Sequence, residues 1–424
     1  MATEEDGPAA SVADGVTASD AETDPRGRWS ALAVLSVATL LAMTTWFSAS
    51  AVLPQLRAEW QLTSNQASLL TIAVQLGFVA GALLSAVFNL ADILPPRRLM
   101  LLGALGAAAA NGLLVVVDRP VPGLVLRFVT GAFLAGVYPP SLKAMATWFQ
   151  RGRGTALGVM VGALTVGSAL PHLVNGFGGL RWQTVILITS LLTLAGGLIA
   201  EVVGRDGPFP FASARFDPRR AGVVFTDRGV RLASVGYFGH MWELYAMWTW
   251  FATFFADVLI AHGRSEPQQS AALATFSVIG IGAAGCVVGG ILSDRWGRTR
   301  AAGLAMVASG SCAVIIGFLW AAPPAVVLVI GLIWGFWVVA DSAQFSTIVT
   351  EVADQASVGT AVTLQLAIGF TLTVVTIWLV PVLRDNFTWQ WSFAFLAPGP
   401  LLGTLAMMRL LRSPEAAQIA GGRG

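Results

Sequence analysis

Long apolar runs recur along the whole chain, and they constrain its fold more than any other feature. Each run holds about 20 residues, which at ~1.5 Å per residue lets a helix cross ~30 Å of hydrocarbon. The runs lie at residues 30–52, 68–90, 98–117, 121–146, 155–176, 183–203, 232–258, 268–291, 300–320, 324–346, 359–382 and 391–411. We therefore predict an all-α membrane protein with twelve transmembrane helices.

Composition excludes a large soluble protein. Charged residues make up 11 % of the 424 residues, whereas a soluble domain carries about 25 %. The net charge of +2 gives no reason to expect a nucleic acid as partner. Both cysteines, Cys286 and Cys312, lie in apolar runs, and the histidines are not at metal-ligand spacing. With no phosphate-binding loop either, we expect no metal, no cofactor and no enzymatic activity.

Short segments of the first half recur in the second half at a nearly constant distance. Thr45-Trp46-Phe47 returns as Thr249-Trp250-Phe251, and Gly154-Thr155-Ala156 returns as Gly359-Thr360-Ala361. Asp92, after the second run, similarly matches Asp294, after the eighth. These matches predict two six-helix bundles related by a pseudo-two-fold axis along the membrane normal.

The longest break between apolar runs separates six runs from six. The expected organisation is a disordered acidic tail (1–28), an N-terminal bundle (29–203), a central loop (204–231), a C-terminal bundle (232–411) and a short tail (412–424). Most of the 25 basic residues fall on the side of the two tails and the central loop. By the positive-inside rule we place both termini in the cytoplasm and the protein in the plasma membrane.

The segment that begins Gly290-Ile-Leu-Ser-Asp294 and ends at Arg300 has the features of a switching loop. Gly290 permits close helix approach, Gly297 permits a tight turn, and Asp294 with nearby arginines can fasten one bundle to the other. The segment resembles the signature loop of the major facilitator superfamily, which lies between spans 2 and 3 and again between spans 8 and 9.

The first-half copy of this loop is degenerate. Phe88 stands at the first glycine position, Ile93 replaces an arginine, and Pro95 replaces the turn glycine. The residues that the resemblance assigns to the two switch loops are Asp92, Arg97, Arg98, Gly290, Asp294, Arg295, Gly297, Arg298 and Arg300.

Arg127 lies within the fourth span and begins the segment Arg-Phe-Val-Thr-Gly. This segment resembles the span-4 arginine motif of superfamily members that move organic or inorganic anions, as in the bacterial cyanate- and nitrate-type permease branches. A charge in hydrocarbon costs about 3 kcal/mol or more, so it needs a partner or a watery cavity. Arg127 could bind an anionic substrate, or it could cap helix carbonyls as a structural residue. Spans 2 and 8 lack the core arginines of nitrate porters, so nitrate in that geometry is not expected.

Span 7 carries Tyr237, His240 and Glu243 at successive three-residue spacings, which places them on adjoining faces of one helix. Glu243 falls near the bilayer midplane, where transporter sites lie. A carboxylate at that depth could bind and release a proton, and His240 could share this role. Both could instead be hydrogen-bonded packing residues.

Two further sets of residues could line a cavity. One helical stripe in span 10 consists of Trp334, Trp337, Asp341 and Gln344. Aromatic stripes also serve packing, and Asp341 could be a gate contact. In span 1, Thr45 and Ser48 could line the cavity or join helices as small hydroxyl residues do.

These observations together predict a secondary transporter that works by alternating access around spans 1, 4, 7 and 10. The expected activity is proton-coupled uptake of a small organic or inorganic anion, with Arg127 attracting the anion and Glu243 with His240, or Asp341, carrying the proton. Two alternatives stay open: a proton-driven efflux pump for hydrophobic or cationic compounds, and a non-transporting membrane receptor. The expected partners are a small-molecule substrate, protons and the lipid bilayer, with the monomer as working unit.

Overall fold

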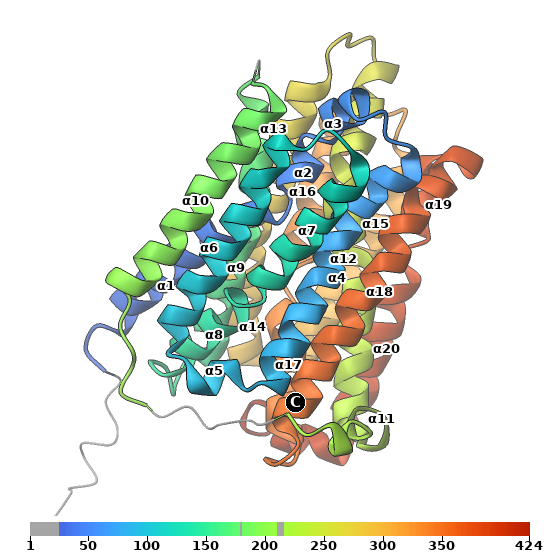
Figure 1. The fold of residues 1–424 in the computed structure, drawn as a ribbon. Helices are drawn as coiled ribbons and strands as arrows, with labels where there is room; N and C mark the ends of the chain where they lie inside the picture. The colour runs from blue at the N-terminus through green and yellow to red at the C-terminus, as the bar shows by residue number, and fades with distance from the viewer. Residues whose placement is uncertain (1–24, 179, 210–215) are drawn as a thin grey trace, which may run out of the picture.

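Twelve membrane-length helices, or pairs of helices, make up most of the chain that the structure describes. The computed structural model describes residues 25–178, 180–209 and 216–424, and it contains no strand within them. Twelve segments in this part of the chain are long and apolar enough to cross a bilayer, and they run side by side (Figure 1). The predicted all-α architecture with twelve spans is confirmed. The predicted disordered tail lies outside the described residues, apart from 25–28.

The helices divide into two sequential sets. The first set is α1 (Arg28–Ala42), η2 (Met43–Thr45), α2 (Ser48–Ala51), α3 (Leu53–Glu59), α4 (Ser64–Val87), α5 (Leu90–Ile93), α6 (Pro96–Gly112), η3 (Leu113–Val116), α7 (Pro120–Leu134), α8 (Tyr138–Ala146), α9 (Arg153–Gly176) and α10 (Trp182–Val202). The second set is η4 (Pro218–Arg220), α11 (Val223–Thr226), α12 (Arg228–Ala261), α13 (Gln268–Gly280), α14 (Gly282–Trp296), α15 (Arg298–Phe318), α16 (Pro324–Trp337), α17 (Ser342–Val352), α18 (Val358–Phe387), α19 (Trp389–Ala394), α20 (Pro398–Leu411) and η5 (Pro414–Gly421).

Several spans are interrupted within the membrane. The first breaks between η2 and α2, the fourth between α7 and α8, and the tenth between α16 and α17. In the fourth span, Pro139 and Pro140 lie in the first turn of α8. Because proline cannot donate the backbone hydrogen bond that a helix interior needs, α7 does not continue through them and a new helix begins there. A break in hydrocarbon frees backbone groups, which must find partners inside the protein.

Two boundaries differ in detail from the sequence-based expectation. Helix α12 begins at Arg228, earlier than residue 232, because the Asp227 side chain accepts a hydrogen bond from the Val230 amide (2.8 Å) and caps it. Residues 412–424, expected as a bare tail, include η5, whose Ile419 is buried. The start of α1 and the C-terminus lie at one end of the molecule, the termini end, and α3 lies at the other, the distal end (Figure 1).

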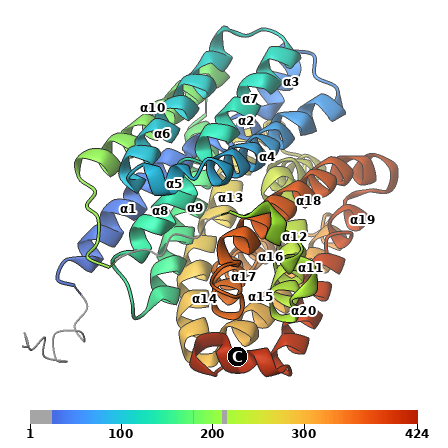
Figure 2. The same ribbon diagram turned by 60° about the horizontal axis from the view of Figure 1, so that its bottom comes forward.

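The two sets of helices meet mainly along three helix pairs (Figure 2). Helix α9 packs against α13 and α14, and α4 packs against α18. A Cβ atom on Gly158 of α9 would lie 2.4 Å from the carbonyl oxygen of Cys286 in α14. The α9–α14 contact is therefore a backbone-to-backbone contact that only glycine allows, as in other close helix pairs in membranes.

We expect Gly158→Ala to destabilise the contact between the halves. The added methyl group meets backbone atoms of α14 that cannot yield, and such overpacking costs about 1–3 kcal/mol. Thermal unfolding in detergent measures the effect as a lower Tm. The control is Gly280→Ala, because a Cβ at Gly280 meets nothing within 4 Å. Equal Tm values for the two variants would contradict the close contact.

Candidate functional site

Arg127, in α7, is completely buried and points at the break in the first span. Its guanidinium donates to the carbonyl oxygen of Thr45 (2.9 Å), to that of Trp46, and more weakly to that of Leu70 (3.5 Å). Thr45 and Trp46 lie where η2 ends and the helix is interrupted. Arg127 thus supplies hydrogen-bond donors to carbonyl groups that the interrupted helix leaves without them.

Asn111, in α6, extends this network. Its Oδ1 accepts a hydrogen bond from Arg127 (2.9 Å) and lies 2.7 Å from the hydroxyl oxygen of Ser48. Its amide nitrogen donates to the hydroxyl of Ser190 in α10 (3.0 Å). All these partners are neutral and belong to the first half, and Thr45 and Ser48 also face this network. The geometry favours the structural role for Arg127 that the sequence left open.

Glu243, in α12, is buried between neutral hydrogen-bond donors. Its Oε1 accepts from the indole nitrogen of Trp334 in α16 (2.7 Å), and its Oε2 accepts from the hydroxyl of Ser309 in α15 (2.8 Å). Neither donor carries a charge, so neither cancels the charge of an ionised carboxylate. A buried carboxyl group in such surroundings is suited to exchange a proton.

His240 lies one turn before Glu243 but contacts different groups. Its Nδ1 is 2.8 Å from Oδ1 of Asp341, and its Nε2 is 2.8 Å from the hydroxyl of Ser342. Asp341 lies at the break between α16 and α17, and no hydrogen bond of good geometry reaches its Oδ1 within the described chain. The contact is therefore electrostatic, and its strength depends on whether His240 is protonated.

The remaining residues of the predicted stripes lie around these two pairs. Tyr237 packs against the rings of His240 (6.1 Å between centroids) and Phe345. Trp337 is half-buried and packs edge-on against Phe336. Gln344 is buried, and its amide atoms have no hydrogen-bond partner in the described part of the chain. The structure therefore joins Trp334 to Glu243 and Asp341 to His240, and it places Trp337 outside both pairs.

At the termini end, Asp294 ties the two halves together. Its Oδ2 accepts hydrogen bonds from the backbone amide (3.1 Å) and the hydroxyl (3.0 Å) of Thr155, at the start of α9. Next to it, Gly297 has a φ of 97°, a backbone conformation that favours glycine. Arg298 forms a bidentate pair with Glu351 of its own half (2.8 Å), and Arg295 and Arg300 are exposed.

The first-half switch residues behave differently from their second-half counterparts. Asp92 pairs with Lys143 of the same half (2.7 Å). Arg97 binds Asp206 (3.3 Å) and Arg98 approaches Glu201 (4.0 Å), again within the first half and the loop that follows it. Thr360, the repeat counterpart of Thr155, accepts a hydrogen bond from the backbone amide of Asp217 instead (2.8 Å). The ion pairs just named lie within the first half and the loop that follows it, whereas Asp294 contacts the other half.

Aromatic side chains from both halves meet in the middle of the molecule. Phe78 of α4 lies 4.7 Å from Phe370 of α18, and Trp46 lies 5.9 Å from Tyr245 of α12, measured between ring centroids. The cluster, here called the aromatic seal, consists of Trp46, Phe47, Phe78, Tyr245, Trp248 and Phe370. These tilted, edge-on and stacked ring pairs fill the space between the halves.

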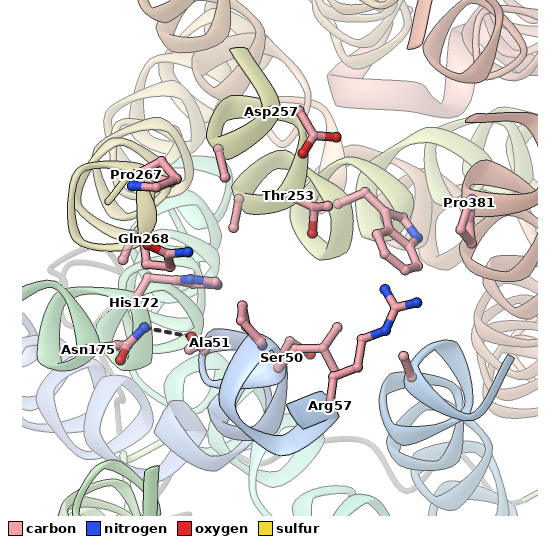
Figure 3. A pocket seen from close by; sticks show the side chains of 18 of the residues that line it. Ser50, Ala51, Arg57, His172, Asn175, Thr253, Asp257, Pro267, Gln268 and Pro381 are labelled. Atoms are coloured by element: carbon pink, nitrogen blue, oxygen red, sulfur yellow. Dashed lines mark hydrogen bonds between the residues drawn. The ribbon is translucent and has the colours of Figure 1, made fainter. Parts of the chain in front are cut away.

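A pocket of about 470 Å³ lies between the halves at the distal end (Figure 3). It reaches from exposed side chains such as Arg57 to buried ones such as His172 and Trp250. Arg384 and Asp257 are its other charged lining residues, and Asn175 donates to the carbonyl oxygen of Ala51 on its wall (2.8 Å). Sequence reasoning did not single out these lining residues, because they are isolated polar residues near span ends. No group of three potential metal ligands occurs in the described chain.

The chain belongs to the Major Facilitator Superfamily, whose family model matches residues 35–261. With its twelve candidate spans it is a multi-pass membrane protein of a transporter family. This agrees with the expectation that the chain is not an enzyme. Solved structures of the same fold include a bacterial homolog to the human lysosomal transporter Spinster, inward-facing and unoccupied. The likeness has a TM-score of 0.67 and 15 % identity, and it covers 92 % of this chain and 100 % of that one.

Curated relatives are similar over part of their lengths. A probable sulfoacetate transporter of Cupriavidus necator is 23 % identical, over 62 % of this chain and 64 % of that one. A gallate transporter of Pseudomonas putida is 23 % identical, over 63 % and 66 %. A multidrug efflux pump of Mycolicibacterium smegmatis is 29 % identical, over 44 % and 38 %. The chain thus matches less than two thirds of the length of each of these relatives.

We expect Arg127→Leu to destabilise the protein strongly. The substitution removes the Arg127 donor from the carbonyl of Trp46 and leaves the carbonyl of Thr45 with the Ser48 hydroxyl alone (3.0 Å). A hydrogen bond to a charged group contributes about 1.5–3 kcal/mol. The measurement is thermal unfolding in detergent, with Arg264→Leu, an exposed arginine, as control. A Tm equal to that of the wild type would show that Arg127 is not structural and would favour substrate binding.

Proposed function

We propose that the chain is a secondary active transporter that moves a small organic or inorganic anion together with protons by alternating access. The observation that carries the proposal is the distal pocket, which reaches the surface between the halves. Toward the termini end, the aromatic seal and the Asp294–Thr155 contact close the same path. A path open at one end and closed at the other is one state of an alternating-access cycle.

The charge of the pocket supports an anionic substrate. Its lining includes Arg57, which has no carboxylate partner in the described part of the chain, Arg384, which pairs with Asp385 (2.7 Å), and Asp257. Asp257 accepts a hydrogen bond from the indole nitrogen of Trp389 (2.9 Å), which engages one of its oxygens. The relatives named for sulfoacetate and gallate carry acids, which fits the same substrate class.

Protons are the proposed coupling ion. Glu243 is buried with neutral hydrogen-bond donors only. Because no neighbouring donor cancels its charge, loss or gain of a proton changes the net charge of this site inside the membrane. The His240–Asp341 contact, one turn away on α12, is the second proposed proton site. Protonation of either site would change the contacts of α12 with α15, α16 and α17, the helices that hold these partners.

Proton-driven efflux of hydrophobic or cationic compounds is the second candidate. Asp257 and the ring of Trp250 both line the pocket and suit a cation with an apolar body. The likeness to a multidrug efflux pump is a further reason to test it. The two candidates differ in the sign of the substrate's charge, which makes them separable in one assay.

Glu243→Gln is expected to abolish substrate-driven proton flux. The assay uses purified protein in liposomes with an imposed pH gradient and an internal pH dye, while small anions and hydrophobic cations are added singly. Because glutamine keeps the shape but cannot take up a proton, flux should fall to that of empty liposomes. Glu266→Gln, an exposed acid at the distal end, is the control.

Proton influx that an external anion triggers in the wild type would support the proposal. Flux that only hydrophobic cations trigger would replace it with efflux. Undiminished flux in Glu243→Gln would remove Glu243 from the coupling pathway.

We propose that the protein resides in the plasma membrane with both termini in the cytoplasm. We also propose that the monomer is the transporting unit. Alkaline phosphatase, which is active only after export, should be inactive when fused after Gly424 and active when fused after Glu266, between α12 and α13. The opposite pattern would invert the orientation. Cross-linking in liposomes that captures the transporting protein as a dimer would contradict the proposal that the monomer is the transporting unit.

A further inference from the structure

We infer that His172 forms a binding subsite for the acidic group of a small organic anion, at the deep end of the distal pocket. The inference rests on the proposed function and narrows its substrate to organic acids with a carboxylate or sulfonate group. It assigns recognition of the acidic group to a residue of α9, the fifth span, whereas the sequence pointed to spans 1, 4, 7 and 10.

His172 is a buried polar side chain without a partner. It is 1 % exposed, and neither of its ring nitrogens has a hydrogen-bond partner in the described part of the chain. Its ring points into the pocket, next to the side chain of Gln268 from α13 (Figure 3). Buried polar groups are almost always hydrogen-bonded, so a ring with two open nitrogens in a pocket indicates a ligand position.

The chemistry of the ring and its surroundings selects an acid. A neutral imidazole offers one N–H donor and one acceptor, and a protonated imidazole offers two donors. Carboxylate and sulfonate oxygens accept bonds from the N–H groups of either form. An ammonium group could use only the acceptor of the neutral ring, so the discrimination against cations comes from the charge of the surrounding residues. Arg57 lines the same pocket without a carboxylate partner among the described residues and favours a negative charge in it, whereas Arg384 is paired with Asp385 (2.7 Å). Asn175, one turn from His172, already donates to Ala51, whereas no hydrogen bond engages the imidazole within the described residues.

The opposite wall suits an apolar body. The ring of Trp250 in α12 lines the pocket, and its indole nitrogen already donates to the carbonyl oxygen of Ile377 (2.9 Å). Trp250 therefore offers apolar surface to a ligand and no open donor. Pro381 and Leu53 line the same pocket, and the volume of about 470 Å³ falls in the range of small-molecule pockets. An acid held by His172 of the first half and Trp250 of the second would bridge the two halves.

Isothermal titration of the purified full chain tests this assignment with benzoate, benzenesulfonate, the neutral isostere benzamide and the cation benzylammonium. We expect the two acids to bind the wild type and the other two compounds to bind at least about tenfold more weakly. His172→Ala should weaken benzoate binding by about tenfold or more, and His172→Gln, which keeps a donor and an acceptor, by less. His262→Ala is the control, because His262 is exposed and its ring contacts the carbonyl oxygen of Val258 outside the pocket.

Loss of benzoate binding in His172→Ala with binding kept in His262→Ala, both variants being monodisperse and equally thermostable, supports the subsite. If His172→Ala unfolds, the comparison of His172→Gln with His262→Ala decides in the same way. Equal binding by His172→Ala and the wild type overturns the subsite, as does a wild type that binds benzamide as tightly as benzoate or binds neither acid. The proposed function is tested separately by anion-driven proton flux in liposomes. If this flux persists while the subsite is overturned, the proposed function stands; if no anion drives proton flux, the proposed function is overturned as well.

Discussion

Hydrocarbon offers no hydrogen bonds, and the architecture depends on how the protein replaces them. The first span is interrupted near Trp46, and the guanidinium of Arg127 provides the donors that its carbonyls lack. Asn111 connects this centre to α6 and α10. Arg127, whose charge would be expensive in lipid, thus joins four helices of the first half around the broken first span.

The second half uses its buried ionisable groups differently. Glu243 faces only neutral donors, and His240 faces a carboxylate whose oxygen has no other well-directed bond. A proton changes the net charge of either site, whereas no proton is needed to satisfy Arg127. The halves are therefore divided in their proposed roles, with the first half supplying a fixed surface and the second responding to protons. The Asp294–Thr155 contact connects them at the termini end.

Features that depend on neighbours in sequence could be predicted, and features that depend on packing could not. The twelve spans, the duplication and the superfamily resemblance follow from local runs and motifs. The partners of Arg127, by contrast, come from α2, α4 and α6 and from a helix break that hydropathy does not reveal. His172 carried no sequence signal, because a lone histidine in an apolar run has no partner to predict. The four residues from Trp334 to Gln344 do not form one stripe, because the tenth span breaks between α16 and α17. The sequence-based expectation treats this span as one continuous helix.

The central claim is that Glu243 binds and releases a proton inside the membrane. Infrared difference spectroscopy between acidic and alkaline samples of the purified protein tests this claim most directly. The account predicts a carboxylic-acid carbonyl band that appears on acidification and is missing in Glu243→Gln, while Glu266→Gln keeps it. A spectrum of Glu243→Gln identical to that of the wild type would contradict the account, because the proton would then be bound elsewhere.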